Sequence, residues 1–205
     1  MKHPFIMPFV YLASQSPRRR QLLEQLGIAH ELLLPAADED AESLEVVLPR
    51  EAPLAYVQRV TQLKLDAALQ RLAKRGLPKA PVLCSDTTVA LGRVILGKPA
   101  DHADAAHMLT QLSGKTHRVL TAVAVGTHAQ RLQTVSASRV TFAPMSHAQI
   151  QAYVATGEPM GKAGAYAVQG RAAAHIAQLS GSYTGIMGLP LFETAQLLRQ
   201  LGFNC

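Results

Sequence analysis

The decapeptide YLASQSPRRR, residues 11–20, joins an apolar run to a helical pattern. The apolar residues around its start predict a buried strand over residues 9–13. Ser16 has the hydroxyl of a good N-cap, and Pro17 suits the first helical position because its missing N–H would have no partner there. Gly27 then marks the C-terminal end of the helix. The segment therefore predicts a strand, a serine-containing loop and a helix in direct succession.

Three arginines, Arg18 to Arg20, occupy the first turn of this predicted helix. The positive end of a helix dipole normally favours acidic side chains. Guanidinium groups beside free backbone N–H groups and serine hydroxyls suit a phosphate or polyphosphate. A capped helix with solvated arginines would explain the motif as well, so the rest of the chain has to decide between the two interpretations.

The bulk composition indicates a folded protein with an anionic partner. The chain has 205 residues, of which 48% are hydrophobic, 5% are aromatic and none is Trp. That length fits one domain or a compact pair of lobes with an aliphatic core, and the few aromatics argue against broad stacking on nucleic-acid bases. The formal charge is +6. Apart from the three arginines the basic residues are scattered, which favours a local anion site over a long nucleic-acid track.

The two cysteines, Cys84 and Cys205, are far apart in the sequence and form no metal-binding pair. This usage fits a reducing compartment. The N-terminal apolar stretch is interrupted by prolines, and no run reaches the roughly 18 apolar residues that a membrane span needs. We therefore expect a cytoplasmic protein with no membrane partner.

Hydrophobic periodicity and turn residues divide the remaining chain into alternating helices and strands. Helices are expected over residues 54–75, 101–112, 147–155 and 191–201, and strands over residues 28–35, 81–91, 94–96, 117–125, 132–142 and 172–179. This order predicts an α/β (α+β) protein with one elongated mixed sheet, and a single domain over residues 1–205 with two lobes.

Two stretches carry charged residues whose purpose the local pattern leaves open. The acidic segment 38–42 is either a solvated loop or a source of carboxylates for Mg²⁺ or Mn²⁺. Lys64, on the long helix, is either solvated or directed at an anion.

Asp86 lies within the apolar run 81–91. An unpaired buried carboxylate is costly, so backbone donors at a strand bend, a metal ion or a catalytic role must explain it. Gly97-Lys98-Pro99 follows after a hairpin-sized connection, which can place Lys98 at the same end of the sheet.

Four glycines fall within residues 157–170, with Lys162, Tyr166 and Gln169 among them. This density indicates either close backbone approach to a neighbour or a mobile lid.

Taken together and in order, these motifs resemble the Maf/Ham1-related nucleotide pyrophosphatases, and specifically the Maf proteins. The matching segments are S-x-S-P-R-R at residues 14–19, the strand around Asp86-Thr87, G-K-P at 97–99, L-S-G-x-x-H at 112–117, K-A-G-A-Y-x-x-Q-G at 162–170, and G-S-Y with G-L-P at 181–183 and 188–190. Each motif alone is weak, but the ordered set covers nearly the whole chain.

The resemblance implies a metal-dependent nucleoside triphosphate pyrophosphatase with a Maf/ITPase-like fold, whose two lobes enclose a central cleft. It places the catalytic aspartate at Asp86 and a specificity triplet at Arg18, Thr87 and Gln169, a combination typical of dTTP/UTP pyrophosphatases rather than of the 7-methyl-GTP subgroup. Asp86 would bind the metal or accept a proton from water.

The resemblance also implies a nucleoside triphosphate substrate, a homodimer and no stable nucleic-acid partner. Mg²⁺ or Mn²⁺ would be bound by Asp86 and Glu39. The substrate would be held by the specificity triplet together with Ser14, Ser16, Arg19, Lys64, Lys98 and Lys162.

The chain departs from the family pattern at Leu63, at Cys84-Ser85 and at Gly161. The alternative function is a septum-formation regulator that acts by binding a division protein or nucleic acid. A Rossmann-type enzyme is disfavoured because no G-x-G-x-x-G follows a strand.

Overall fold

The computed structural model describes residues 9–37, 39–40 and 43–205. In chain order, its helices and strands are β1 (Val10–Leu12), α1 (Pro17–Gln25), β2 (His30–Leu32), η1 (Ser43–Glu45), α2 (Pro53–Lys74), β3 (Val82–Leu91), β4 (Val94–Leu96), α3 (His102–Leu112), β5 (Thr116–Gly126), β6 (Arg131–Phe142), α4 (His147–Val154), η2 (Ala163–Ala165), η3 (Arg171–His175), β7 (Ile176–Ser180), α5 (Tyr183–Met187) and α6 (Leu191–Gln200).

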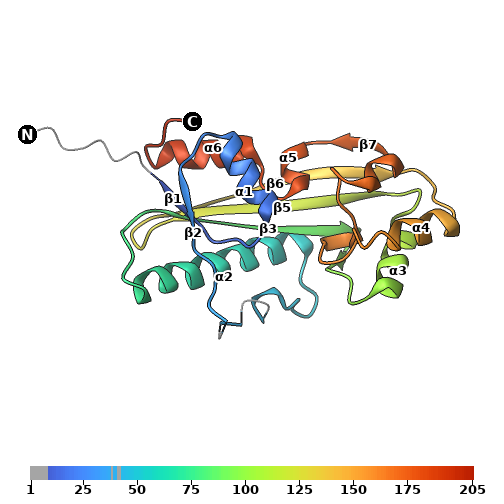
Figure 1. Cartoon of the computed structure of the whole chain (residues 1–205), viewed down its shortest axis with the longest axis horizontal. Helices are drawn as coiled ribbons and strands as arrows, with labels where there is room; N and C mark the ends of the chain where they lie inside the picture. The colour runs from blue at the N-terminus through green and yellow to red at the C-terminus, as the bar shows by residue number, and fades with distance from the viewer. Residues whose placement is uncertain (1–8, 38, 41–42) are drawn as a thin grey trace, which may run out of the picture.

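The strands form one mixed sheet in the order β2-β1-β3-β5-β6-β7, with β4 paired to part of β3. Strand β1 runs parallel to both of its neighbours, whereas the pairs from β3 through β7 are antiparallel. The long strands β3, β5 and β6 run the length of the molecule (Figure 1). The expected α/β class with an elongated mixed sheet is therefore confirmed.

Helices cover the sheet differently at its two ends. At one end, α2 lies along one face of the sheet while α1 and α6 lie over the other (Figure 1). Leu65 and Leu69 of α2 pack with β3, and Leu22 of α1 packs with Leu197 of α6. At the other end, α3 and α4 form a separate cluster with the start of β5. Different helices thus cover the two ends of one continuous sheet.

One side of β3 is only partly covered by neighbouring strands. The register pairs β1 with Val82 and Leu83, and β4 with residues 89–91. Among the residues that the structure describes, residues 84–88 of β3 have a strand partner on the β5 side and none on the β1–β4 side. This gap leaves the middle of β3 accessible from the edge of the sheet.

Most predicted elements are confirmed, and Asp86 lies in the middle of a continuous strand rather than at a bend. The final helix agrees with its prediction, but the prediction for residues 171–187 was wrong in two places. Residues 171–175, at the start of the expected strand, form a 3-10 turn before β7, and the short helix α5 over residues 183–187 was not predicted. Ser182 caps α5 by accepting a hydrogen bond from the Gly185 N–H. Glycine at 185 and the shortness of the helix hid this signal in the sequence.

Across the described part of the chain, none of the helices combines the length and the apolar character required to cross a bilayer.

Candidate active site

A cavity of about 1030 Å³ opens at the uncovered edge of β3. Its walls come from the β1–α1 loop, α2, β3, the turn after β4 and the segment 161–169. All the site residues expected from the sequence line it, namely Ser14, Ser16, Arg18, Arg19, Glu39, Lys64, Asp86, Thr87, Lys98, Lys162 and Gln169. The fold therefore brings together segments that lie far apart in the chain.

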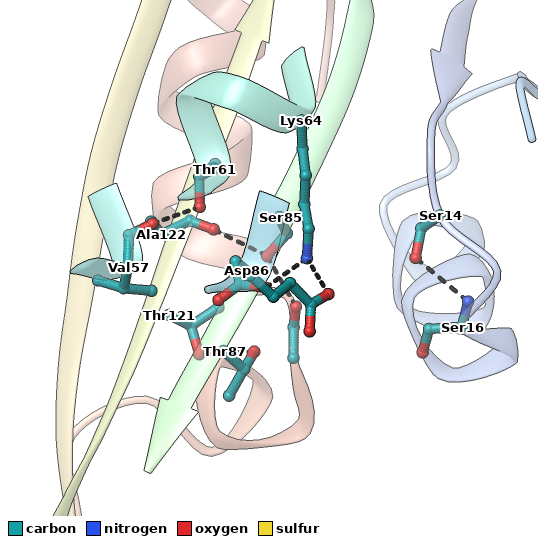
Figure 2. Close-up of polar contacts among 12 residues, drawn as sticks. Ser14, Ser16, Val57, Thr61, Lys64, Ser85, Asp86, Thr87, Thr121 and Ala122 are labelled. Carbon is teal, nitrogen blue, oxygen red and sulfur yellow. Dashed lines mark hydrogen bonds and ion pairs between the residues drawn. The ribbon is translucent and has the colours of Figure 1, made fainter. Parts of the chain in front are cut away.

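Asp86 is paired with Lys64 across the space between β3 and α2. The Lys64 Nζ lies 2.6 Å from the Asp86 Oδ1, and Figure 2 shows the lysine reaching down from the helix to the strand. Alternation along β3 directs the side chains of Val82, Cys84 and Asp86 to the face that α2 covers. This ion pair explains how a carboxylate can lie in a largely buried strand.

Glu45 of η1 is a second carboxylate at this position, and it was missed in the sequence. Its Oε1 accepts a hydrogen bond from the Lys64 Nζ at 2.8 Å, and its Oε2 accepts one from the Lys98 Nζ at 3.0 Å. Burial alone would raise the pKa of Glu45. The charges and hydrogen bonds of Lys64 and Lys98 together have a larger effect in the opposite direction, so the pKa of Glu45 lies below its usual value. Glu45 follows the acidic segment by a few residues, and no local motif distinguishes it.

The other face of β3 presents hydroxyl groups to the arginine-rich helix. The Arg19 Nη2 donates a hydrogen bond to the Thr87 Oγ1 at 3.3 Å, and its Nη1 lies 3.5 Å from the Ser14 Oγ. Ser16 caps α1 as expected, because its Oγ accepts a hydrogen bond from the Arg19 N–H. Burial lowers the pKa of the Arg19 guanidinium, which still carries its charge at neutral pH.

The departure from the family pattern at Ser85 has a structural consequence. The Ser85 Oγ lies 2.9 Å from the carbonyl oxygens of both Ala122 and Gly188. The Arg19 Nε donates to the same Gly188 oxygen at 2.8 Å. Because Gly188 ends α5 in a left-handed conformation with φ of 119°, its carbonyl is presented to both side chains. These contacts fix Arg19 beside β3.

The glycine-rich segment is docked onto β3 and onto the G-K-P turn. The Gly164 N–H donates a hydrogen bond to the Gly97 carbonyl at 3.0 Å. A Cβ on Gly164 would lie 2.7 Å from Val89, so the close approach that the glycines predict occurs here. Docking places the segment next to the turn that carries Lys98, and Lys162 and Gln169 line the same cavity.

Arg18 and Lys162 each form a hydrogen bond with a residue three or four positions away in the chain. The Arg18 Nη1 donates to the Gln21 Oε1 at 2.8 Å, and the Lys162 Nζ donates to the Glu158 carbonyl oxygen. Both side chains line the cavity, so a ligand there would compete with these contacts.

Glu39 has a different partner from Asp86. Its carboxylate forms a bidentate ion pair with Arg71, whose Nε and Nη2 lie 2.8 Å and 2.6 Å from Oε2. The Arg71 hydrogen bond is the main cause that lowers the pKa of Glu39 to about 2. The two carboxylates expected to share a metal ion thus have separate partners in this structure. Asp38 and Glu42 of the acidic segment lie outside the described residues.

Oxygen donors for a hard divalent cation are present but few. Lys64 already places a cationic nitrogen between the carboxylates of Asp86 and Glu45, which shows that a positive charge fits there. Within residues 9–37, 39–40 and 43–205, no group of three or more His, Cys, Asp or Glu side chains could hold a metal ion. Such a site suits Mg²⁺, which commonly takes one or two protein carboxylates and completes its shell with substrate phosphates and water.

A cavity with cations on several walls, hydroxyl groups and a helix N-terminus around one buried carboxylate defines a protein that binds a polyphosphate ligand. The comparisons with known proteins agree with this class. The family model described as "Maf-like protein" matches residues 9–201, and the chain belongs to that family.

Close relatives match over almost their whole length. A protein of Albidiferax ferrireducens named "dTTP/UTP pyrophosphatase" is 74% identical over 96% of this chain and 98% of its own. Proteins of the same name from a Polaromonas species and from Cupriavidus metallidurans are 69% and 64% identical, over 96% and 95% of this chain and 97% and 98% of theirs.

The structure of the Staphylococcus aureus Ham1 protein is a distant likeness, with 11% identity and a TM-score of 0.40 over 65% of this chain and 71% of that one.

Proposed function

We propose that the protein is a nucleoside triphosphate pyrophosphatase that hydrolyses dTTP and UTP to the monophosphate and pyrophosphate. The observation that carries this proposal is the cavity in which Asp86 lies among Lys64, Lys98 and Arg19. The names of the relatives, at up to 74% identity, point to the same activity. They do not favour the alternative of a division regulator.

The reaction breaks the bond between the α and β phosphates, so it needs charge neutralisation around the phosphates and a positioned water. Lys64, Lys98, Lys162 and Arg19 come from different segments of the chain, line the cavity and supply cationic donors. Ser14 and Ser16 add hydroxyl groups near the N-terminus of α1. These groups would hold the triphosphate with its α phosphorus turned toward β3.

Asp86 is the catalytic carboxylate in this proposal. A bound Mg²⁺ or Mn²⁺ would neutralise phosphate oxygens and lower the pKa of a coordinated water. Asp86 either binds that cation or accepts the proton of the attacking water. Glu39 is the second proposed ligand, and it would have to leave Arg71 to take that role. Calorimetry of Mn²⁺ binding to Asp86→Asn separates the two roles. If Asp86 is a metal ligand, the variant should bind Mn²⁺ more weakly than the wild type, and if Asp86 only accepts the proton, the Mn²⁺ affinity should be unchanged.

The test of the function is pyrophosphate release from a panel of nucleoside triphosphates with Mg²⁺ or Mn²⁺. We expect release from dTTP and UTP, and a loss of at least 100-fold in Asp86→Asn at an unchanged melting temperature, because such groups each contribute several kcal/mol to catalysis. Asp66→Asn, which removes a carboxylate paired with Arg131 outside the cavity, is the matched control and should keep its activity. A protein that releases pyrophosphate from none of the nucleotides would contradict the proposal.

Arg18, Thr87 and Gln169 are the proposed determinants of base preference. The amide of Gln169 can donate to a pyrimidine carbonyl and accept from the N3–H, which matches thymine and uracil. Gln169 is half-buried in the cavity wall. Thr87 is hydrogen-bonded to Arg19, so these residues would link base and phosphate recognition.

We also propose that the enzyme is a cytoplasmic homodimer without a stable nucleic-acid partner. Its two cysteines are unpaired, as expected in a reducing compartment. Sedimentation equilibrium and a DNA-binding titration test these expectations.

A further inference from the structure

Glu45 occupies the position between the two lysines that the proposed function assigns to substrate phosphate. One carboxylate oxygen accepts from Lys64 at 2.8 Å and the other from Lys98 at 3.0 Å. The first lysine comes from α2 and the second from the turn after β4. A single carboxylate therefore bridges two walls of the cavity across which a triphosphate would have to lie.

The segment that carries Glu45, residues 43–48, is here called the strap. The strap is attached to α2 by side-chain hydrogen bonds, from the Tyr56 hydroxyl to the Glu45 carbonyl at 2.8 Å and from Arg59 to the Val46 carbonyl at 2.9 Å. None of the residues of η1 is buried, and Val46, Val47 and Leu48 are 60%, 47% and 48% exposed. Moving the strap would therefore expose little core surface.

A phosphate oxygen and a carboxylate oxygen make equivalent contacts with an ammonium group. Both cannot occupy the same position on Lys64 and Lys98. We propose that Glu45 is a displaceable placeholder for substrate phosphate, and that the strap swings away from the two lysines when a polyphosphate binds. This inference rests on the proposed function, because that function places phosphate on these lysines.

In this arrangement the Glu45 carboxylate accepts hydrogen bonds from the Lys64 and Lys98 ammonium groups as long as no anionic ligand is bound. The carboxylate keeps Lys64 and Lys98 oriented toward the cavity and lowers the local positive charge. The placeholder also competes with the ligand, so removing its charge should strengthen polyphosphate binding. A residue that only orients the lysines, or that binds the metal, would have the opposite effect when it is removed.

The first test uses inorganic triphosphate as the probe, with calorimetry and no divalent cation. We expect Glu45→Gln to bind the probe about three- to tenfold more tightly than the wild type, the size that loss of two partly exposed ion pairs allows. Glu24→Gln, which makes the same charge change on an exposed part of α1, should stay within about twofold. Weaker or unchanged binding by Glu45→Gln would overturn the proposal, as would failure of both proteins to bind.

The second measurement separates the placeholder from a metal ligand. Mn²⁺ affinity without nucleotide should be the same in Glu45→Gln as in the wild type. A loss of about tenfold or more in Mn²⁺ affinity would make Glu45 a ligand and refute the placeholder role.

The third test follows the strap itself. The chain contains no Trp, so Val47→Trp introduces a single fluorescent reporter at an exposed strap position. Its emission should change as inorganic triphosphate saturates the site, whereas Leu77→Trp, in the exposed turn after α2, should show no change. An unchanged strap reporter at saturation would mean that the strap stays in place, and the proposal would fail.

These outcomes are independent of hydrolysis, because inorganic triphosphate binding needs no pyrophosphate release from a nucleotide. If the enzyme is active but the strap does not move, the placeholder proposal is refuted and the proposed function stands. If Glu45→Gln binds inorganic triphosphate more tightly but the protein hydrolyses no nucleotide, the proposed function is refuted and the displacement of Glu45 by polyphosphate stands.

Discussion

His117 shows how a residue of a family motif can lie behind the site rather than in it. Its side chain is 2% exposed, its Nε2 is hydrogen-bonded to the Tyr166 hydroxyl at 2.8 Å, and its ring stacks on Phe142. Burial lowers the pKa of His117 to about 4. The imidazole is therefore neutral at physiological pH and supports the glycine-rich segment through Tyr166.

This shift predicts a loss of stability in mild acid. Between pH 6.5 and about 4 the unfolded state binds a proton that the folded state rejects, so the free energy of unfolding falls as pH falls. From pH 7.5 to pH 5 the His117 contribution falls by about 2 kcal/mol. The free energy of unfolding of His117→Gln, measured by urea denaturation, should fall less between pH 7.5 and pH 5 than that of the wild type. The exposed His107→Gln should follow the wild-type curve, and equal slopes in all three proteins would refute the assignment.

A second prediction at the residue scale concerns Gln169. Replacing its amide by a carboxylate in Gln169→Glu removes the donor to a pyrimidine carbonyl and adds repulsion. We expect the ratio of kcat/KM for dTTP over GTP to fall about 10- to 100-fold, since unmatched polar groups cost about 1–3 kcal/mol. Gln178→Glu on the exposed strand β7 is the matched control. An unchanged ratio would exclude Gln169 as a base contact.

Among the secondary-structure elements, the glycine-rich segment is tied together by Glu158, whose carboxylate links the start of the segment to its end. The Glu158 carboxylate accepts hydrogen bonds from the Tyr153 hydroxyl at 2.9 Å and from the Arg171 N–H at 3.0 Å. It fits against Gly170, where a Cβ would lie 2.2 Å from Glu158 Oε1. The carboxylate thus connects α4, the start of the segment and its end.

Loosening this contact should impair substrate binding without removing a catalytic group. Glu158→Gln leaves one of the two donors without a good acceptor, which costs about 1–2 kcal/mol. We expect KM for dTTP to rise about 5- to 30-fold with kcat changed less than threefold. Gly170→Ala should act similarly, and the double variant should be no worse than Gly170→Ala alone because both changes break one contact. Additive effects would show that the two positions act separately, and Glu31→Gln on β2 serves as the surface control.

The elements themselves differ in how strongly the sequence specifies them. The helix after Pro17 and the helix at 147–154 have side-chain caps in the chain, and both begin where their caps predict. The region 171–187 has alanines and glycines in place of a periodic pattern, so a 3-10 turn and the short α5 were missed.

At the scale of the whole molecule, the continuous sheet should couple the two lobes. Leu65 packs beneath one end of the sheet and Leu112 beneath the other, and neither is exposed. Leu65→Ala and Leu112→Ala should each cost about 2–5 kcal/mol and shift one common unfolding transition, seen equally by circular dichroism and tyrosine fluorescence. Leu54→Ala, at a position 47% exposed, is the control. Two separate transitions, each moved by one variant, would instead indicate two domains.

Local patterns in the chain specify most of the helices and strands and the candidate site residues. Caps, periodicity and turn residues are local signals, so α1, α2 and the long strands could be predicted with their bounds. The ordered motifs also indicated which side chains would line one cavity. These inferences needed only neighbouring residues or a known pattern.

The pairing of the charged side chains, by contrast, depends on how the chain folds. The pairing of Lys64 with Asp86 and Glu45, and of Glu39 with Arg71, depends on how α2 and the loop before it lie against β3. The sequence carries no short-range signal for such contacts, because ion pairing is set by distance and burial after the chain has folded. The gap in the sheet between β1 and β4, which opens the site, likewise arises only from strand register.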